Sequence, residues 1–349
     1  MLFNHNYLMN ILIKSGKLII VLCLLGLFVF SGCKRQNRFD VDVDKISLKI
    51  TIQRFDKDLF SIDTSHVQDG ITKLHQKYGS PYMNLYFSKV MQLDSTGDAR
   101  LNGLTAAFLK DTAVRSVFRE SLRQYSNISD IEAKVTDAFK RIHYFFPEKK
   151  IPQLYLHVSM FNQSLVVDQN IISLSVDNYL GANYYWYKKV VYDYLRPNMC
   201  REKVASDFVT AYLMTEFPAP NSERFLDNML FRGKMMFALS VLMPKEKPET
   251  LMGYTKAQMD WCSRNEKSMW LNIMDGKQLY SSDPMMSNAY LNDAPFTSIV
   301  SQDSPGRVGT WIGWQIVKQY MEHHQDVTLQ ALLADNNYQQ LLEQSGYKP

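Results

Sequence analysis

A short apolar run near the start of the chain decides which part of it can become the folded protein. Lys14 and Lys17 precede an uninterrupted apolar stretch from Leu18 to Phe30, and Ser31-Gly32-Cys33 closes it. This order of basic, apolar and small-residue regions is typical of a secretory signal peptide. The run is shorter than the roughly 20 residues that a helix needs to span the hydrocarbon core of a bilayer. We therefore predict that residues 1–32 are removed on export.

The residues that end this run resemble a bacterial lipobox. In a lipobox, a cysteine follows two small residues, its thiol receives lipid, and it becomes the first residue of the mature chain. Ser31 and Gly32 precede Cys33 here, although Phe30 is bulkier than the Leu, Val or Ile usual at that place. The alternative is a short uncleaved anchor. We predict lipidation of Cys33, which attaches the protein to a membrane because two or more acyl chains give stable anchoring.

The chain behind this cysteine is long enough for one large domain or two small ones. Residues 33–45 are polar and have no helical period, so they predict a tether. Residues 46–349 contain no repeat and no low-complexity insert. The simplest interpretation is one α+β domain that is mostly helical. Its helical N-terminal part covers about 56–146, and a small antiparallel sheet with further helices covers about 150–349.

Charge and cysteine content exclude some classes of protein. Of 39 basic and 35 acidic residues, only Lys14 and Lys17 lie in the leader, so 37 basic residues face 35 acidic ones in the mature chain. That balance lacks the basic stripe of a nucleic-acid-binding protein. Cys200 and Cys262 remain after export, in a compartment where disulfides form. They are either bonded or, as we expect, two free thiols.

Hydrophobic periodicity and capping residues predict two groups of helices. The first group comprises 66–78, 83–91, 98–110, 111–125 and 128–145. The second comprises 201–217, 222–242, 256–274, 306–322 and 328–343. Asp111 and either Ser129 or Asp130 are the expected N-caps in the first group.

Three short apolar runs between the helical groups predict strands. They are Gln153–Ser159, Ser164–Val167 and Asn170–Ser175, with a turn at Asp168-Gln169-Asn170. Ile46–Phe55 alternates between apolar and polar residues, so it predicts a fourth, half-buried strand joined to the same sheet. We expect this sheet to be antiparallel.

The common catalytic signatures are missing from the sequence. It contains no G-x-S-x-G, no phosphate-binding G-x-x-x-x-G-K-[ST] and no H-E-x-x-H. None of the seven histidines has another three or four residues away, the spacing that places two ligands on one helical face. We therefore predict no metal, no cofactor and no catalytic residue.

The stretch from Ser304 to Trp314 (SPGRVGTWIGW) is the most unusual part of the body. A glycine at a helix start lets backbone N–H groups gather around an anion, and an arginine there adds a charge-assisted donor. The alternative interpretation is structural: Gly309 and Gly313, four residues apart, let another element approach closely, with the tryptophans packed on the flanks. We favour the packing interpretation. The candidate ligand or partner contacts in this stretch are Gly306, Arg307 and Trp311.

Two sets of charged residues have ordinary structural interpretations. Asp168 and Asp177 flank the predicted hairpin and are expected to serve turns and caps rather than a carboxylate pair. A mixed set in the 222–242 helix predicts a solvated helix face rather than a binding site. Its members are Glu223, Arg224, Asp227, Arg232 and Lys234.

Short motifs follow one another along nearly the whole mature chain. In order, they include Gln53-Arg54-Phe55-Asp56, Tyr179-Leu180-Gly181, Leu226-Asp227-Asn228-Met229, Asn292-Asp293-Ala294-Pro295-Phe296 and the stretch 305–317 (PGRVGTWIGWQIV). Their order and coverage resemble the gliding-motility lipoprotein GldB family of Bacteroidota. The resemblance implies an envelope lipoprotein associated with surface motility and the linked secretion machinery, with partners among envelope proteins. Relatives also occur in bacteria that do not glide.

Several expectations follow about place and role. Surface display in these bacteria usually follows an acidic cluster behind the lipidated cysteine, whereas Lys34-Arg35-Gln36-Asn37-Arg38 is basic. We therefore expect the protein to face the periplasm. These residues leave open which membrane holds it, and we favour the outer membrane over the inner. The expected role is that of a non-catalytic accessory component.

The order of elements is also similar to zinc-peptidase folds, in which one helix carries H-E-x-x-H and the next supplies an acidic ligand. The corresponding stretches here, Asp207–Ala211 and Phe231-Arg232-Gly233, contain no histidine and place a cation where the acid is needed. A degenerate zinc-peptidase-like (zincin-like) scaffold is therefore one possible fold.

Two other functions remain open. The first is an envelope hydrolase, acting on peptide or peptidoglycan, with a cleft near Arg307 and either Glu216 or Glu223. The second is a binder of anionic wall fragments through Arg307 and a tyrosine-rich patch. That patch comprises Tyr184, Tyr185, Tyr187, Tyr192 and Tyr194.

Overall fold

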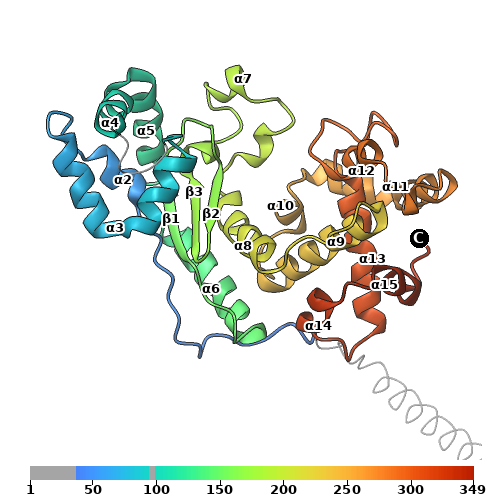
Figure 1. Cartoon of the computed structure of the whole chain (residues 1–349). Helices are drawn as coiled ribbons and strands as arrows, with labels where there is room; N and C mark the ends of the chain where they lie inside the picture. Colours follow the sequence, from blue (N-terminus) through green and yellow to red (C-terminus); the bar gives the residue numbers. More distant parts are fainter. Residues whose placement is uncertain (1–36, 94–98) are drawn as a thin grey trace, which may run out of the picture. The chain divides into compact units, whose positions relative to one another are not determined.

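The computed structural model describes residues 37–93 and 99–349 of the chain. The predicted signal peptide, the predicted lipidation site Cys33 and the first part of the predicted tether lie outside these residues. Residues 42–349 form one compact unit, and residues up to Val41 belong to another. Within the described residues, the unit is mostly helical with one small sheet (Figure 1).

Among the described residues, five helices precede the sheet: α2 Phe55–Phe60, α3 Val67–Lys89, α4 Leu101–Lys110, α5 Thr112–Gln124 and α6 Ser129–Phe145. The predicted break between two helices near residue 80 is confirmed as a kink inside α3. Gly79 there has φ +75°, a conformation that glycine adopts at little cost, and Pro81 follows.

The expected N-caps of this group have different outcomes. Asp111 is confirmed, since its Oδ1 accepts from the backbone N–H groups of Ala113 and Val114 at 2.8 and 3.0 Å. The prediction of Ser129 or Asp130 for α6 is wrong. Its N-cap is Ile128, without a side-chain cap, and Asn127 Oδ1 instead accepts from the N–H of Ser129.

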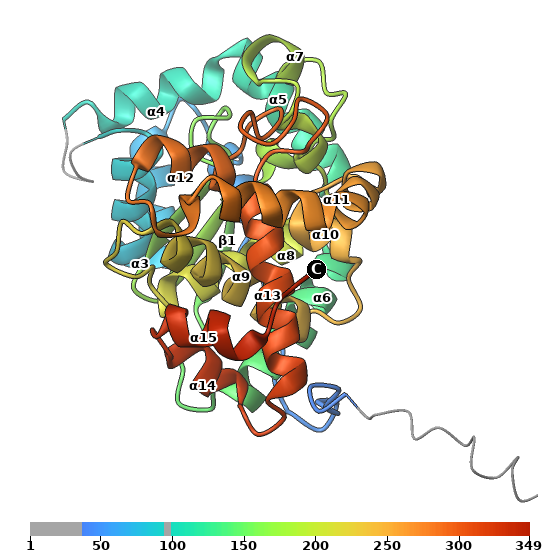
Figure 2. The same cartoon turned by 90° about the vertical axis from the view of Figure 1, so that its right-hand side faces the viewer.

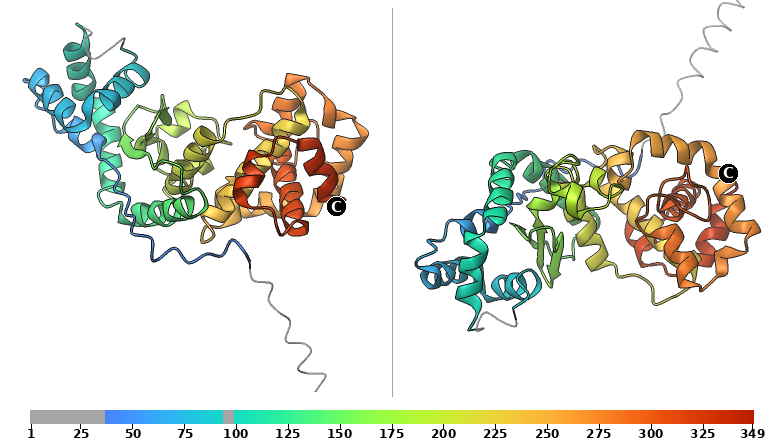
Figure 3. Two further views of the ribbon diagram at one scale, coloured as in Figure 1. Left: turned by 60° about the horizontal axis from the view of Figure 1, so that its bottom comes forward. Right: turned by 90° about the horizontal axis from the view of Figure 1, so that it is seen from above.

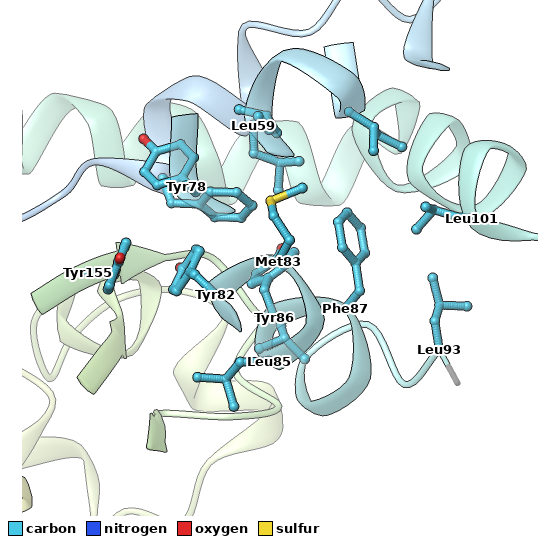
Figure 4. Close-up of a cluster of buried hydrophobic side chains, with 14 of the residues drawn as sticks. Leu59, Tyr78, Tyr82, Met83, Leu85, Tyr86, Phe87, Leu93, Leu101 and Tyr155 are labelled. Atoms are coloured by element: carbon cyan, nitrogen blue, oxygen red, sulfur yellow. The ribbon is translucent and has the colours of Figure 1, made fainter. Parts of the chain in front are cut away.

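An aromatic cluster joins α2 and α3 to the sheet (Figure 4). Tyr82 on α3 stacks on Tyr155 of the first strand, with ring centroids 3.8 Å apart. Phe55 on α2 meets Tyr82 and Tyr86 edge-on, at 4.9 and 4.6 Å. Full burial of one such ring contributes roughly 1.5–3 kcal/mol, so this contact is a main reason for the position of α3 against the strand.

The sheet has three strands in the order β1-β3-β2: β1 Gln153–His157, β2 Leu165–Asp168 and β3 Ile171–Ser175. The predicted hairpin is confirmed, because β2 and β3 are antiparallel around a turn at Gln169. The expectation of a wholly antiparallel sheet is wrong, because β3 runs parallel to β1. Strand β3 lies between the two earlier strands, and it is buried along its whole length because it is the central strand.

The predicted strand Ile46–Phe55 is reduced to one bridge, between Gln53 and Tyr155 of β1. Upstream of it, side chains of α6 take the backbone donors that a ladder requires. The N–H of Ile50 donates to Thr136 Oγ1 at 3.0 Å, and the N–H of Ile52 donates to Glu132 Oε1 at 2.9 Å. The alternating burial is real, but the hydrogen bonds go to a helix.

The elements that follow the sheet are η1 Val176–Tyr179, α7 Tyr187–Val190, η2 Arg196–Asn198, α8 Lys203–Glu216, α9 Phe225–Leu242, α10 Pro248–Met252, α11 Lys256–Asp275, η3 Gln278–Tyr280, α12 Pro284–Leu291, α13 Val308–His323, α14 Leu329–Ala334 and α15 Tyr338–Ser345. The predicted helix 328–343 is therefore two helices. Helices α10 and α12 were not predicted, although each begins with a proline at its first helical position, a known start signal.

Helices α9 and α13 cross at two glycines (Figure 2). A Cβ on Gly233 would lie 2.3 Å from the carbonyl oxygen of Gly313, and one on Gly313 would lie 2.3 Å from that of Met229. The packing interpretation of Gly309 and Gly313 is therefore confirmed, since Gly309 also contacts Tyr290. Helices α11, α12, α14 and α15 pack on α9, α13 or both (Figure 3).

The structure also bears on three further predictions from the sequence. Cys200 and Cys262 are both free, as expected. The prediction of a solvated charged face on α9 is wrong, because Asp227 is 7% exposed and Lys234 only 1% exposed. The zincin-like scaffold is not supported: Asp207 pairs with Lys203, while Arg232 donates to the Leu291 carbonyl, so the two stretches have different partners.

Candidate functional site

Arg307 lies at a cavity of about 280 Å³ bounded by α8, α9, α10 and the loops before α13. Half of its lining residues are leucine or methionine, and its polar groups lie near Arg307 and along α8. We call it the Arg307 cavity. Its lining residues are Leu195, Asn198, Lys203, Asp207, Thr210, Leu213, Met235, Met236, Leu239, Leu251, Met252, Gly253, Asp293 and Arg307.

The C-terminal end of α10 positions the polar side of this cavity. A helix end leaves carbonyls without intrahelical partners, and here three side chains donate to them. Lys203 Nζ reaches the Thr250 carbonyl at 3.1 Å, Arg307 Nη2 the Met252 carbonyl at 2.8 Å and Asn198 Nδ2 the Gly253 carbonyl at 3.0 Å. A glycine is required at 253, where φ is +71° and an added Cβ would lie 3.0 Å from Arg307.

Arg307 is held by further contacts. It is the N-cap of α13, in a left-handed conformation with φ +62°. Its Nε pairs with Asp293 Oδ1 at 2.9 Å, and its guanidinium lies 5.7 Å from the ring of Tyr254. The Tyr254 hydroxyl donates to the carbonyl of Gly306, where a Cβ would lie 2.4 Å from the Ala294 carbonyl oxygen. Gly306 therefore serves the turn that places Arg307.

A second arginine adds positive charge beside this site. Arg232 donates to the Leu291 carbonyl at 2.7 Å and to Asn292 Oδ1 at 3.2 Å, both neutral acceptors. Burial, and secondly the nearby Arg307 guanidinium, lower the pKa of Arg232, while Asp293 opposes that shift. Asp293 thus faces two cations and is itself 54% exposed.

Trp311 is separate from the cavity. It is 3% exposed and is not one of the lining residues. Its Nε1 has no hydrogen-bond partner among the described residues. The structure therefore brings Arg307 to the cavity, places Gly306 behind it, and leaves Trp311 in the packing of α13.

A second cavity of about 370 Å³ adjoins the first. We call it the Tyr192 cavity. The two share Leu195, Asn198 and Asp207 in their walls. The other residues that line it are Phe161, Ser164, Asn178, Tyr179, Val190, Val191, Tyr192 and Met199. Of the tyrosine-rich patch, Tyr192 therefore lies at this site.

The tyrosines of that patch divide between the surface and the core. Tyr185 and Tyr192 are 60% and 73% exposed. Tyr187 is fully buried, and its hydroxyl donates to the carbonyl of Asp177. Tyr194 stacks on Tyr192, with centroids 5.8 Å apart.

The carboxylates proposed for a hydrolase are elsewhere. Glu216 pairs with Lys149 at 2.9 Å, Glu223 is exposed, and neither lines the Arg307 cavity. Asp177 is fully buried and accepts from the N–H groups of Ser159 and Phe161 at 3.2 and 3.0 Å, the structural duty expected of it. Burial raises its pKa despite these bonds.

Sequence reasoning missed Lys203, Asp207 and Asn198. The first two form an i,i+4 ion pair of 3.1 Å on α8, a spacing visible in the sequence. Their convergence with Arg307 depends on α10, which the sequence analysis did not predict. In the ranges 37–93 and 99–349, no group of three or more His, Cys, Asp or Glu side chains could hold a metal ion. No helix within those ranges has both the length and the apolar character to cross a bilayer.

Comparison with known proteins identifies a family model that matches most of the chain. The family model described as gliding motility protein GldB matches residues 36–349. Neither the curated proteins nor the solved structures contain a significant match to this chain. The resemblance noted in the sequence is confirmed, and it covers the entire compact unit.

Proposed function

Because this chain belongs to the family of the gliding motility protein GldB, we propose that it is a periplasm-facing accessory protein that supports a motility- or secretion-linked assembly by binding. Membership makes it a gliding-motility lipoprotein of the cell envelope. The single observation that carries the proposal is this family match, which spans residues 36–349.

Two features of the chain support the proposed place and role. The lipobox-like ending at Cys33 supplies the anchor, and the basic residues behind it favour an orientation toward the periplasm. The Arg307 cavity has apolar walls and a charged rim held by the carbonyls of α10. A mostly apolar concave site with a few fixed polar groups is the form that binding sites commonly take.

The first experiment tests the anchor. We expect the full chain to incorporate labelled palmitate and to remain with the membrane until detergent is added. Cys33→Ser should abolish the label, the processing and the motility- or secretion-linked activity of the host. Cys200→Ser is the matched control, because it removes a free thiol that lies far from the lipobox-like sequence. A processed, membrane-bound and active Cys33→Ser protein would contradict the proposal.

The second experiment tests the accessory role. A photo-crosslinking residue at Thr210, in the wall of the Arg307 cavity, should capture envelope proteins in intact cells. The same residue at Glu223, which is exposed outside the cavity, is the control. Equal products at both positions would exclude a partner site at the cavity.

A further inference from the structure

The Arg307 and Tyr192 cavities are adjacent compartments of one groove. Leu195, Asn198 and Asp207 belong to the walls of both. Their volumes, about 280 and 370 Å³, together fall within the roughly 300–1,000 Å³ of small-ligand sites. A ligand that fills the groove is therefore elongated, with one end at Arg307 and the other at Tyr192.

The Arg307 end of the groove fits an apolar side chain. Met235 and Met236 on α9 face the site together with Met252 at the end of α10. Methionine is unbranched and polarizable, so such walls adapt to apolar groups of different shape.

The same end also carries more positive than negative charge. Arg307 and Arg232 lie near one carboxylate, Asp293, whose side chain is 54% exposed. An ion pair with an exposed partner contributes little to stability, so a ligand carboxylate can replace Asp293 at small cost. Arg307 itself is only 23% exposed and is oriented by its bond to the Met252 carbonyl. A guanidinium fixed in this way is suited to a bidentate carboxylate contact.

The shared middle of the groove offers polar groups at intervals. The Asp207 carboxylate already accepts from the Tyr179 hydroxyl at 2.9 Å, and Asn198 lies beside it in both walls. Farther along, Asn178 is only 7% exposed, and its Nδ2 has no hydrogen-bond partner in the described part of the chain. A buried amide donor without an acceptor is costly, and a carbonyl of a ligand would relieve that cost.

We propose that this groove binds the free C-terminus of a partner polypeptide whose last side chain is apolar. The terminal carboxylate replaces Asp293 on Arg307, the last side chain enters the methionine-lined wall, and the preceding backbone follows Asn198 toward Asn178 and Tyr192. This inference deepens the proposed accessory role, on which it rests, by stating the chemistry of the partner. A fatty acid would share the carboxylate but would leave the polar middle of the groove unmatched.

The test uses the full-length lipidated protein in detergent micelles and fluorescein-labelled hexapeptides that end in leucine, phenylalanine or methionine. We expect fluorescence anisotropy to show saturable binding of at least one peptide with a free carboxylate. The same peptide with a C-terminal amide should bind at least about tenfold more weakly, since a charge-assisted contact is lost. If none of the three acid peptides binds with a Kd below about 1 mM, or if acid and amide bind equally, the proposal is wrong.

Variants separate a binding role from a structural one. Asp293→Asn removes the competing carboxylate and should tighten peptide binding about threefold or more; unchanged or weaker binding overturns the replacement of Asp293. Arg307→Gln should weaken binding about tenfold. Arg123→Gln, which removes an exposed ion-paired arginine on α5, should leave binding unchanged. Because Arg307 also caps α10, the Asp293 variant keeps the test decisive if Arg307→Gln does not fold.

Two further measurements complete the test. The first identifies the source of the bound carboxylate, and the second separates this proposal from the proposed accessory function. Dodecanoate should not displace the bound peptide; competitive displacement would favour a lipid ligand and contradict the peptide. The Cys33→Ser protein should bind the peptide as the lipidated protein does. Loss of anchoring with intact peptide binding affects only the proposed function, and the reverse affects only this inference.

Discussion

At the scale of single residues, Lys234 shows how tertiary context overrides a surface interpretation. Its Nζ donates to the carbonyl of Asp335 and lies 3.5 Å from that of Leu333, at the end of α14. The ring of Tyr338 is 4.9 Å from the same ammonium. Lys234 is therefore a buried cap of another helix. Desolvation lowers its pKa to about 8, partly opposed by Asp335.

This pKa predicts a pH dependence of stability. Between pH 8 and 10.5 the unfolded chain keeps a proton on Lys234 that the folded chain has released, so stability rises with pH in that window. Between pH 8 and pH 10, the free energy of unfolding of the wild type should rise by about 2 kcal/mol relative to Lys234→Met. Urea titrations at both pH values measure it.

The control for this effect is Lys256→Met, which removes a lysine that is 80% exposed. Its stability should follow that of the wild type across the same pH range. Equal pH slopes for the wild type and Lys234→Met would show that the ammonium is not desolvated as described.

At the scale of elements, the crossing of α9 and α13 depends on the absence of side chains at Gly233 and Gly313. Backbone meets backbone there, because a Cβ on either glycine would lie 2.3 Å from a carbonyl oxygen. Such contacts cannot be relieved by a rotamer change. The helices would have to move apart, and α15, which packs on both, would move with them.

We predict that Gly313→Ala destabilises the protein by about 1–3 kcal/mol, since overpacking forces a backbone shift. Gly103→Ala is the matched control. Gly103 is exposed on α4, and no atom of residues 37–93 and 99–349 lies within 4 Å of the added Cβ, so alanine there should stabilise by about 0.5–1 kcal/mol. Thermal unfolding followed by circular dichroism compares the two variants. Similar shifts of the unfolding temperature would contradict the close backbone contact at the crossing of α9 and α13.

Helix α5 provides a second prediction at this scale. Asp111→Ala removes a cap that serves two backbone donors and should cost about 1 kcal/mol of unfolding free energy. Ser129→Ala at the start of α6 should have a smaller effect, because no side-chain cap is present there. Urea unfolding of both variants measures the difference. A larger loss of stability for Ser129→Ala than for Asp111→Ala would contradict the capping role of Asp111.

At the scale of the whole molecule, α8 links the two ends of the compact unit. It packs against α6 and the sheet, and also against α9 and α10. Helices that share one core partner are expected to unfold together, so we propose that residues 46–349 behave as a single domain.

This proposal predicts one cooperative unfolding transition. All five tryptophans, at 186, 261, 270, 311 and 314, follow the sheet, so their fluorescence reports only the C-terminal part. Circular dichroism at far-ultraviolet wavelengths reports every helix. The two signals should coincide in urea, because two-state unfolding shows the same transition by every probe. A dichroism change that precedes the fluorescence change would divide the unit into two domains.

The sequence by itself determined those features that depend on neighbours in the chain. The kink at Gly79, the cap at Asp111 and the hairpin around Gln169 follow from local conformational preference, which acts before any tertiary contact forms. The close approach at Gly309 and Gly313 was also visible, because small residues four apart lie on one helix face. Family membership was recognisable from the order of the motifs.

Only the tertiary structure decided what distant segments do to one another. The strand pattern at Ile46–Phe55 was real, but α6 competes for its backbone donors. The direction of β1 against β3, the burial of Lys234 and the groove beside Arg307 depend on where helices pack. Residue patterns report the face that a segment buries; the partner that covers that face depends on the shapes and hydrogen-bonding groups of the whole unit.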